Sequence, residues 1–150
     1  MNVDKRPKEK TLSPNLLDLF YQILILCESD AINNLNITIN DPKLKEFINN
    51  KDYKEKDKIT LAYSSKSKKK KVDFNSALEL NEIRFNNTKN NVIKSLFWHL
   101  RHAFAHNRLS FHDKKNHILY IENVSKGTTQ MKAKVRVSNF KKFISFLLTK

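Results

Sequence analysis

The sequence predicts a single, mainly helical domain: a helical bundle followed by a small C-terminal antiparallel β-hairpin or meander and a closing helix. The spacing of apolar residues in three stretches of the chain predicts this fold class, and the length of the chain predicts a single domain. Apolar residues recur mostly at helical spacing up to residue 106, alternate after Asn107, and return to helical spacing after Ser138. The 150 residues suffice for one domain with a sizeable core, and no internal repeat or change of composition divides residues 1–150.

The first part of the chain is predicted to hold two helices behind a polar arm. Residues 1–12 are polar and rich in lysine, and we expect a flexible basic arm. Ser13-Pro14 is typical of a helix start, and the apolar residues that follow predict a mostly buried helix to about Ala31. Asp41-Pro42 repeats this signal for a short helix through Ile48.

The middle of the chain carries weaker signals. Residues 59–63 fit either a helical turn or a short strand. Residues 64–72 contain the run S-K-S-K-K-K-K, which is typical of a solvated loop. Asp73 or Asn75 is then expected to cap a helix that runs to about Ile83.

A long helix, three strands and a closing helix are predicted after that. The long helix is expected from about residue 88 to 106. Alternating apolar residues predict strands at 109–111, 117–121 and 132–137, separated by D-K-K-N and S-K-G-T-T-Q turns. Ser138 is expected to cap the closing helix. Its apolar residues recur at helical spacing: Phe140, Phe143, Ile144 and Leu147.

Composition limits the classes of function. The formal net charge of +14 favours nucleic acid as a partner, because phosphate contacts supply most non-specific nucleic-acid affinity. The single glycine, Gly127, excludes Gly-rich phosphate-binding loops, and the single cysteine, Cys27, excludes a disulfide framework. We expect no cofactor. With no visible signal peptide or membrane-spanning segment, we expect a cytoplasmic protein without membrane contact.

The helix expected to end at His106 has an unusual composition. From Phe97 to Phe111 the chain reads F-W-H-L-R-H-A-F-A-H-N-R-L-S-F, which includes its only tryptophan. On a helical projection Trp98 and Ala105 lie opposite the apolar face, so we expect an interface with another chain or a stacked base there. Cover by the chain's own arm or by the lysine-rich loop is the alternative. The apolar face consists of Val92, Ile93, Leu96, Phe97, Leu100, Ala103 and Phe104.

Three interpretations fit the polar residues of this helix. His99, His102 and His106 form a stripe that could bind zinc, although the neighbouring arginines oppose a cation. The second interpretation is structural: His99 borders the apolar face, and for this residue a hydrogen-bonded histidine in the core is a better explanation than a zinc ligand. The third interpretation is acid–base chemistry on RNA, in which His106 transfers protons near neutral pH and Arg101 stabilises the phosphate.

The segment R-H-A-F-A-H, Arg101 to His106, resembles the R-x4-H motif of the HEPN superfamily, small helical domains that include many ribonucleases of toxin and phage-defence systems. The resemblance covers about residues 96–148, where the turn, the strand I-L-Y-I-E-N and the final helix S-N-F-K-K-F-I-S-F-L follow in the same order. It implies that Arg101 and His106 are catalytic. His102 takes the polar position after the arginine, where the superfamily commonly has Asn or Asp, and is a supporting catalytic candidate.

The resemblance also implies a homodimer, because active members bring two such motifs together. A single helix would hold Arg101 and His106 about 140° apart, too far for one compact site. Two copies could supply both residues to one cleft and cover Trp98 and Ala105.

The expected function is therefore a metal-independent endoribonuclease in a toxin–antitoxin or anti-phage setting, with RNA as substrate. A non-catalytic RNA- or nucleotide-binding module, or a subunit that docks an antitoxin or another defence protein, is the alternative. The expected RNA contacts outside the motif are Lys68, Lys69, Lys70, Lys71 and Arg108.

Overall fold

The computed structural model describes residues 18, 21, 37–50, 53–65, 67, 69–106, 108–113 and 118–148. The predicted arm at residues 1–12 lies outside the described residues. Of the helix predicted up to Ala31, only Asp18 and Tyr21 are described, and both are helical.

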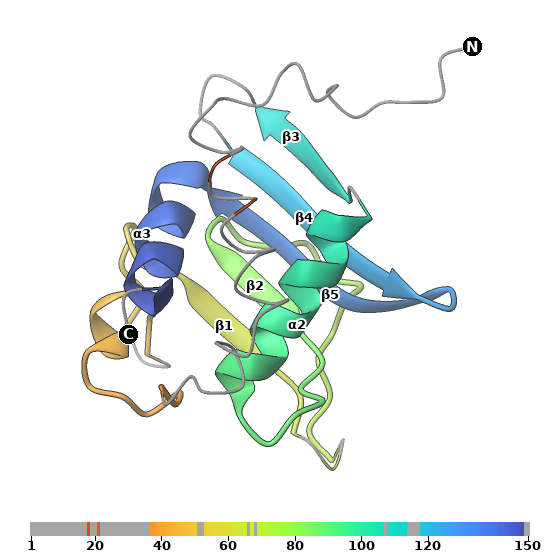
Figure 1. The fold of residues 1–150 in the computed structure, drawn as a ribbon, viewed down its shortest axis with the longest axis horizontal. Helices are drawn as coiled ribbons and strands as arrows, with labels where there is room; N and C mark the ends of the chain where they lie inside the picture. Colours follow the sequence, from red (N-terminus) through yellow and green to blue (C-terminus); the bar gives the residue numbers. More distant parts are fainter. Residues whose placement is uncertain are drawn as a thin grey trace.

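A five-stranded mixed sheet, with strand order β1-β2-β5-β4-β3, forms the centre of the described fold (Figure 1). β1 and β2 are parallel, and every other pair of neighbouring strands is antiparallel. The strands are β1 Thr60–Tyr63, β2 Glu82–Phe85, β3 Leu109–Asp113, β4 Ile118–Ser125 and β5 Thr128–Arg136.

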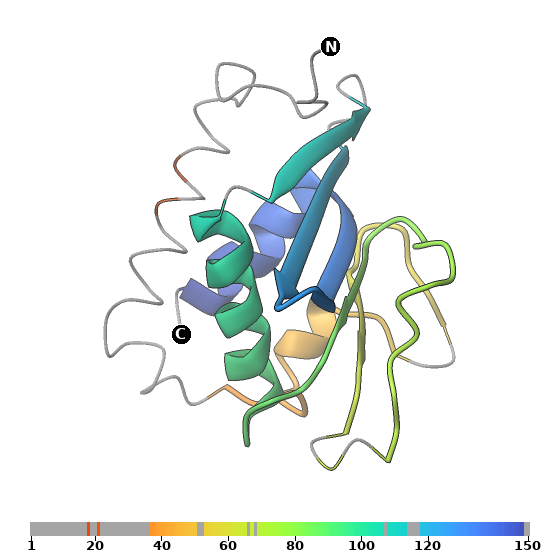
Figure 2. The ribbon, with the colours of Figure 1, turned by 90° about the vertical axis from the view of Figure 1, so that its right-hand side faces the viewer.

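Two α-helices, α2 (Val92–Ala105) and α3 (Val137–Leu148), lie on one face of this sheet (Figure 2). A short 3-10 helix, η2 (Leu44–Glu46), precedes β1. The prediction of a mainly helical bundle is therefore wrong, because in the described residues a mixed sheet forms a full layer and the helices cover only one side of it. Neither described α-helix is long and apolar enough to cross a membrane.

Two predicted helices are absent or shortened in the described residues. The prediction of a helix from Asp73 or Asn75 to about Ile83 is wrong: a loop leads into β2, whose residues alternate between the two faces of the sheet. The helix expected through Ile48 is reduced to η2. The ambiguous residues 59–63 contain a strand, β1, and the part of the lysine-rich loop that is described contains neither helix nor strand.

The elements predicted after residue 88 are confirmed in type and order. α2 ends at Ala105, three strands follow, and α3 begins at Val137, one residue before the predicted cap at Ser138. β4 and β5 are joined by a tight turn in which Lys126 and Gly127 have φ values of 52° and 78°. Two consecutive positive φ values are typical of the hairpin turn that matches the twist of its strands, and glycine adopts this conformation without steric cost.

The core lies between the helices and the sheet. Six of the seven residues predicted for the apolar face of α2 are buried, and Val92 packs at the edge of the core. The predicted apolar residues of α3 are all buried as well. They meet the inward-facing side chains of the central strands: Ile83, Phe85, Leu119, Ile121, Met131, Ala133 and Val135.

Asn91 caps α2, and its replacement by alanine is expected to lower the free energy of unfolding by about 1–2 kcal/mol. Its Oδ1 accepts hydrogen bonds from the N–H groups of Ile93 and Lys94 at 2.8 and 3.2 Å, and its Nδ2 donates to the carbonyl of Ile37 at 2.9 Å. Urea unfolding measures the change. Asn75→Ala, an exposed Asn in a loop, is the matched control, and an equal loss in both variants would contradict the capping role.

Candidate functional site

The outward surface of α2 carries a column of three rings spaced four residues apart: Trp98, His102 and His106. The Trp98 and His102 ring centroids are 4.5 Å apart, and those of His102 and His106 are 6.3 Å apart. His102 Nδ1 lies 3.0 Å from the carbonyl oxygen of Trp98. Because a carbonyl only accepts, Nδ1 carries the proton of this bond, and in the neutral ring Nε2 is then an acceptor.

A lysine that the sequence reasoning missed lies over the Trp98 end of this column. Lys89 Nζ is 4.5 Å from the centroid of the Trp98 ring, within the range of a cation–π contact. Trp98 nevertheless remains 44% exposed. Lys89 belongs to the segment that precedes α2, so this contact joins that segment to the outward surface of the helix. No signal in the sequence pairs residues 89 and 98, since Lys89 lies before the helix cap and outside any helical spacing.

The end of α2 is held in place by two backbone contacts. The Arg108 N–H donates to the Ala103 carbonyl at 2.9 Å, which is the long bond of a Schellman helix end. The Glu122 N–H in β4 donates to the Arg108 carbonyl at 3.1 Å. Asn107, which lies between, is outside the described residues. His106 is the C-cap residue and is exposed, so its side chain is presented to solvent from a fixed backbone.

The remaining predicted motif residues lie on the same helix. Arg101 is half-buried and Ala105 is exposed. Arg101 and His106 are separated by five positions, or about 140° around the helix, so they lie on different sides of α2. The residues that the fold brings together are Trp98, His102 and His106, while Arg101 projects from another side.

The lysine-rich loop is remote from this motif. Ser64, which opens the loop, accepts a hydrogen bond from the N–H of Asn87 just before α2, so the loop lies near the first turn of α2 (Figure 1). The 14 residues of α2 place its two ends about 20 Å apart. Lys69, Lys70 and Lys71 are exposed, and Lys68 is outside the described residues. Of the predicted RNA contacts that the structure describes, only Arg108, also exposed, adjoins the motif.

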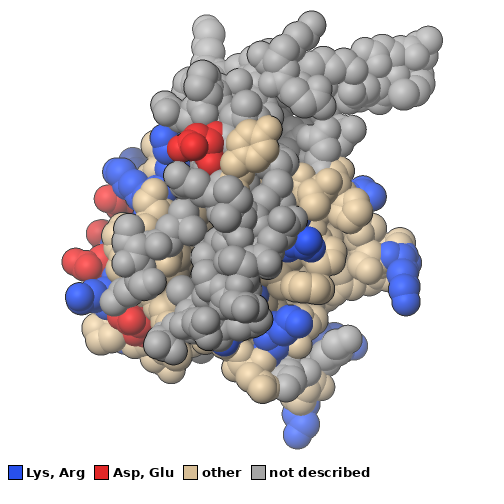
Figure 3. Space-filling view, viewed as in Figure 1, with Lys and Arg blue, Asp and Glu red and all other residues tan. Residues whose placement is uncertain are grey.

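Positive charge nevertheless gathers along one side of the molecule. Figure 3 shows Lys and Arg on both sides of this face, whereas Asp and Glu lie on one side only, so the side that carries α2 and the lysine-rich loop has the excess of positive charge. This distribution of charge favours the binding of a polyanion along α2.

His99 is a hydrogen-bonded core histidine, as the second interpretation of the sequence held. It is 2% exposed. Its Nε2 lies 2.7 Å from the Asn86 carbonyl, to which it donates, and its Nδ1 accepts from the Asn123 side chain at 3.0 Å. Because both nitrogens are engaged, His99 is not available to the zinc stripe that was the less favoured interpretation of the sequence. Among the residues that the structure describes, no three His, Cys, Asp or Glu side chains are placed to hold a metal ion.

Burial of His99 makes the stability of the protein sensitive to mild acid. Burial lowers the pKa of the ring below the value of 6.5 that an unburied histidine has. The unfolded chain therefore binds a proton as the pH falls through 6.5 while the folded chain does not, so the free energy of unfolding falls below that pH. Urea midpoints measured between pH 7.5 and 5.5 should decline in the wild type. The decline should be smaller in His99→Gln than in the wild type and in Asn75→Ala, a control at an exposed loop position without a titratable group; equal slopes in all three proteins would contradict the assignment.

Comparison with known proteins is consistent with the motif. The family model of HEPN pEK499 p136 matches residues 7–150. No curated protein and no solved structure matches the chain. The matched span covers nearly the whole sequence, including all of the described strands and helices. The chain therefore belongs to the HEPN pEK499 p136 family and contains a HEPN superfamily domain, as the R-x4-H motif predicted.

Proposed function

We propose that this protein is a metal-independent endoribonuclease that acts as a homodimer. One observation carries the proposal: the R-x4-H sequence of a HEPN family member lies at the end of α2, with His106 exposed beside the rings of His102 and Trp98. His106 is the acid–base residue, Arg101 stabilises the phosphate, and His102 is a supporting residue.

The two main residues suit the two requirements of metal-free RNA cleavage. The 2′-hydroxyl attacks the adjacent phosphorus, and a base must remove its proton while an acid protonates the leaving 5′-oxygen. Histidine changes its protonation state near neutral pH and serves either role. The additional negative charge on the phosphate needs a cation, and the arginine guanidinium offers two parallel N–H groups to phosphate oxygens.

Dimerisation is proposed because one helix presents these residues in different directions. A two-fold axis near the end of α2 would bring Arg101 of one copy toward His106 of the other. The exposed indole of Trp98 and the small side chain of Ala105 suit close contact with a second copy. The positive side of the molecule would guide RNA to this cleft, with Arg108 closest to it and the lysine-rich loop at a distance.

The biological setting that we propose, a toxin–antitoxin or anti-phage system, rests on the superfamily resemblance of the motif. RNA is the proposed substrate in either setting. An antitoxin or another defence protein is a proposed further partner.

The proposal is tested by incubating the purified full chain with labelled single-stranded RNA in EDTA. We expect cleavage that leaves 2′,3′-cyclic phosphate and 5′-hydroxyl ends, because the 2′-oxygen is the nucleophile. Cleavage that requires an added divalent metal would overturn the mechanism. RNA binding without cleavage would support the non-catalytic binding module instead, and neither binding nor cleavage would support the partner-docking subunit.

A further inference from the structure

A groove of about 700 Å³ runs along the outer edge of β1, far from the motif on α2. β1 is an edge strand of the sheet, with β2 on one side only. Leu61, Ala62 and Tyr63 of β1 line the groove between two walls, which are drawn from residues 39–50 and 70–76.

The two walls stand on opposite sides of the sheet. The 39–50 wall lies on the helix side, because Phe47 stacks on Phe146 of α3 with ring centroids 4.6 Å apart. The 70–76 wall lies on the outer side, where Arg84 points away from the core and donates to the carbonyls of Asp73 and Ser76. Figure 2 shows η2 and residues 70–80 on these two sides. The edge of β1 is therefore the floor of the groove.

Backbone groups on this floor lack a strand to pair with. The N–H groups of Thr60 and Ser64 donate to Asn81 and Phe85, so even-numbered residues of β1 face β2. The N–H and C=O groups of Leu61 and Tyr63 must point the other way, into the groove. Residues 39–50 pair with this edge only at Ile59, through one isolated bridge to Ile48. Within the described residues no partner meets the groups of Leu61 and Tyr63.

The charged side chains that line the groove are mainly cationic. Lys45 lies in one wall and Lys70 and Lys71 in the other. A further lysine, Lys58, is paired with Glu55 at 2.7 Å. The carboxylate of Asp73 accepts hydrogen bonds from the N–H groups of Asn75 and Ser76. Since both acidic side chains of the lining are engaged locally, the remaining lysines favour an acidic occupant.

Two tyrosines line the groove: Tyr53 is 68% exposed, and Tyr63, on the floor of the groove, is poorly placed to stack on a base. Bases bind single-strand sites by stacking on free aromatic faces. One side of the Tyr63 ring meets Phe85, at a centroid distance of 5.6 Å, and Lys70 lies 5.9 Å from its centroid. An open strand edge between two walls instead suits an extended peptide, whose backbone pairs with the edge while its side chains contact the walls.

We propose that the β1 edge binds an extended acidic segment of a partner protein, which adds to the sheet as a sixth strand. The backbone of the segment pairs with Leu61 and Tyr63, and its carboxylates contact Lys45 and Lys71. This docking site is independent of the proposed ribonuclease activity.

The binding test uses a fluorescein-labelled peptide of alternating glutamate and valine, blocked at both ends, and fluorescence anisotropy with the full chain. We expect saturable binding that is weakened about tenfold or more in Lys45→Glu/Lys71→Glu. The matched control is Lys126→Glu/Lys142→Glu, which changes the same net charge at exposed positions outside the groove and should bind as the wild type does. Absence of saturable binding, or equal loss in both variants, would overturn the proposal.

A second measurement identifies the edge and needs no variant. In the bound state the amides of Leu61 and Tyr63 should gain protection from hydrogen exchange, while that of Ala62, which faces β2, should change little. Binding without this pattern would place the peptide elsewhere. A single-stranded RNA of similar charge that binds more tightly and loses binding in Lys45→Glu/Lys71→Glu would assign the groove to nucleic acid instead.

Discussion

Replacing His106 with alanine is expected to slow metal-free RNA cleavage by about 10²–10⁴-fold, because a positioned general acid or base contributes that much. The side chain is exposed at the last turn of α2, and its ring contact is with His102. Its loss should therefore leave the urea midpoint close to that of the wild type. Initial rates on labelled single-stranded RNA in EDTA measure the effect.

The control for this variant is Lys142→Ala, which removes an exposed side chain on α3. It should cleave at the wild-type rate. A His106→Ala protein that cleaves as fast as the control would exclude His106 from the reaction.

Arg101→Lys keeps the charge but loses the paired N–H groups of the guanidinium. Its cleavage rate should therefore fall well below that of the wild type if the guanidinium contacts the phosphate.

Mixing two inactive variants tests whether the site is shared between copies. Arg101→Ala and His106→Ala each lack one group, and a mixed dimer contains one cleft with both groups intact. If each cleft takes Arg101 and His106 from different copies, an equal mixture should recover roughly a quarter of the wild-type rate. No recovery, with mixed dimers demonstrated by mass spectrometry, would contradict a site built from two chains.

The elements after residue 88 could be predicted because their signals are local. α2 has an Asn cap and a broad apolar face, and β4 and β5 are joined by a turn that contains the only glycine. Neighbouring strands in this part follow one another in sequence, so alternation and a turn are sufficient to identify them.

β2 was missed, and β1 could not be distinguished from a helical turn, because the partners of these strands are distant in the sequence. β2 lies between β1 and β5, and its Ile83 pairs with Ala133, which is 50 positions later. Four residues, E-I-R-F, are too short to display a clear period. Asp73 resembled a helix cap, but its carboxylate accepts the N–H groups of Asn75 and Ser76 in a turn, and these bonds lower its pKa. Asp caps turns and helices by the same kind of hydrogen bond, so sequence alone could not separate them.

In the candidate site, too, the features with a local signal in the sequence could be predicted and those that depend on contacts between distant residues could not. The positions of Arg101, His102 and His106 on one helix follow from spacing along the chain. The distance between the lysine-rich loop and the motif depends on where β1 lies in the sheet, and the contact of Lys89 with Trp98 depends on how the chain enters α2. Both are tertiary features without a local pattern.

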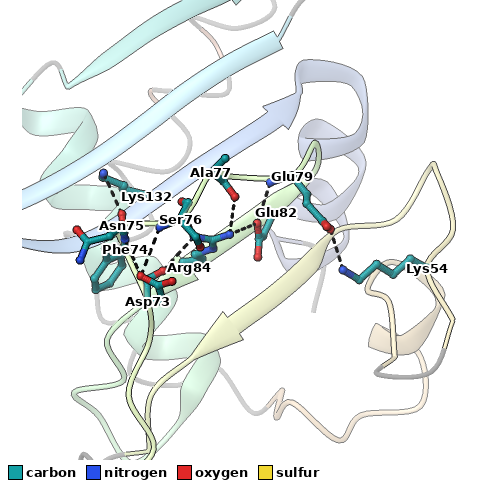
Figure 4. Close-up of polar contacts among 10 residues, drawn as sticks. All are labelled: Lys54, Asp73, Phe74, Asn75, Ser76, Ala77, Glu79, Glu82, Arg84 and Lys132. Atoms are coloured by element: carbon teal, nitrogen blue, oxygen red, sulfur yellow. Dashed lines mark hydrogen bonds and ion pairs between the residues drawn. The ribbon is translucent and has the colours of Figure 1, made fainter.

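Replacing Arg84 with methionine is expected to lower the free energy of unfolding by about 3–5 kcal/mol, as removal of one partner of a buried ion pair does. Arg84 is only 8% exposed. Its guanidinium donates to Glu82 Oε1 at 3.0 Å and to the carbonyls of Asp73, Ser76 and Ala77 at 2.8–3.0 Å (Figure 4). Methionine fills a similar volume but leaves those carbonyls without their donor and the buried Glu82 carboxylate without its counter-charge, although the Glu79 N–H still donates to that carboxylate at 2.9 Å.

Urea unfolding at neutral pH measures the loss, and two further variants locate its cause. Lys54→Met breaks the ion pair of Lys54 with Glu79, whose partners are 2.8 Å apart but 54% and 66% exposed, and should leave the midpoint almost unchanged. Adding Glu82→Leu to Arg84→Met should recover part of the stability, because it removes the buried charge that was left unpaired. If Arg84→Met unfolds at the wild-type midpoint, the loop at residues 73–77 is held against the sheet by other contacts, such as that of Lys132 Nζ with the Phe74 carbonyl at 3.2 Å.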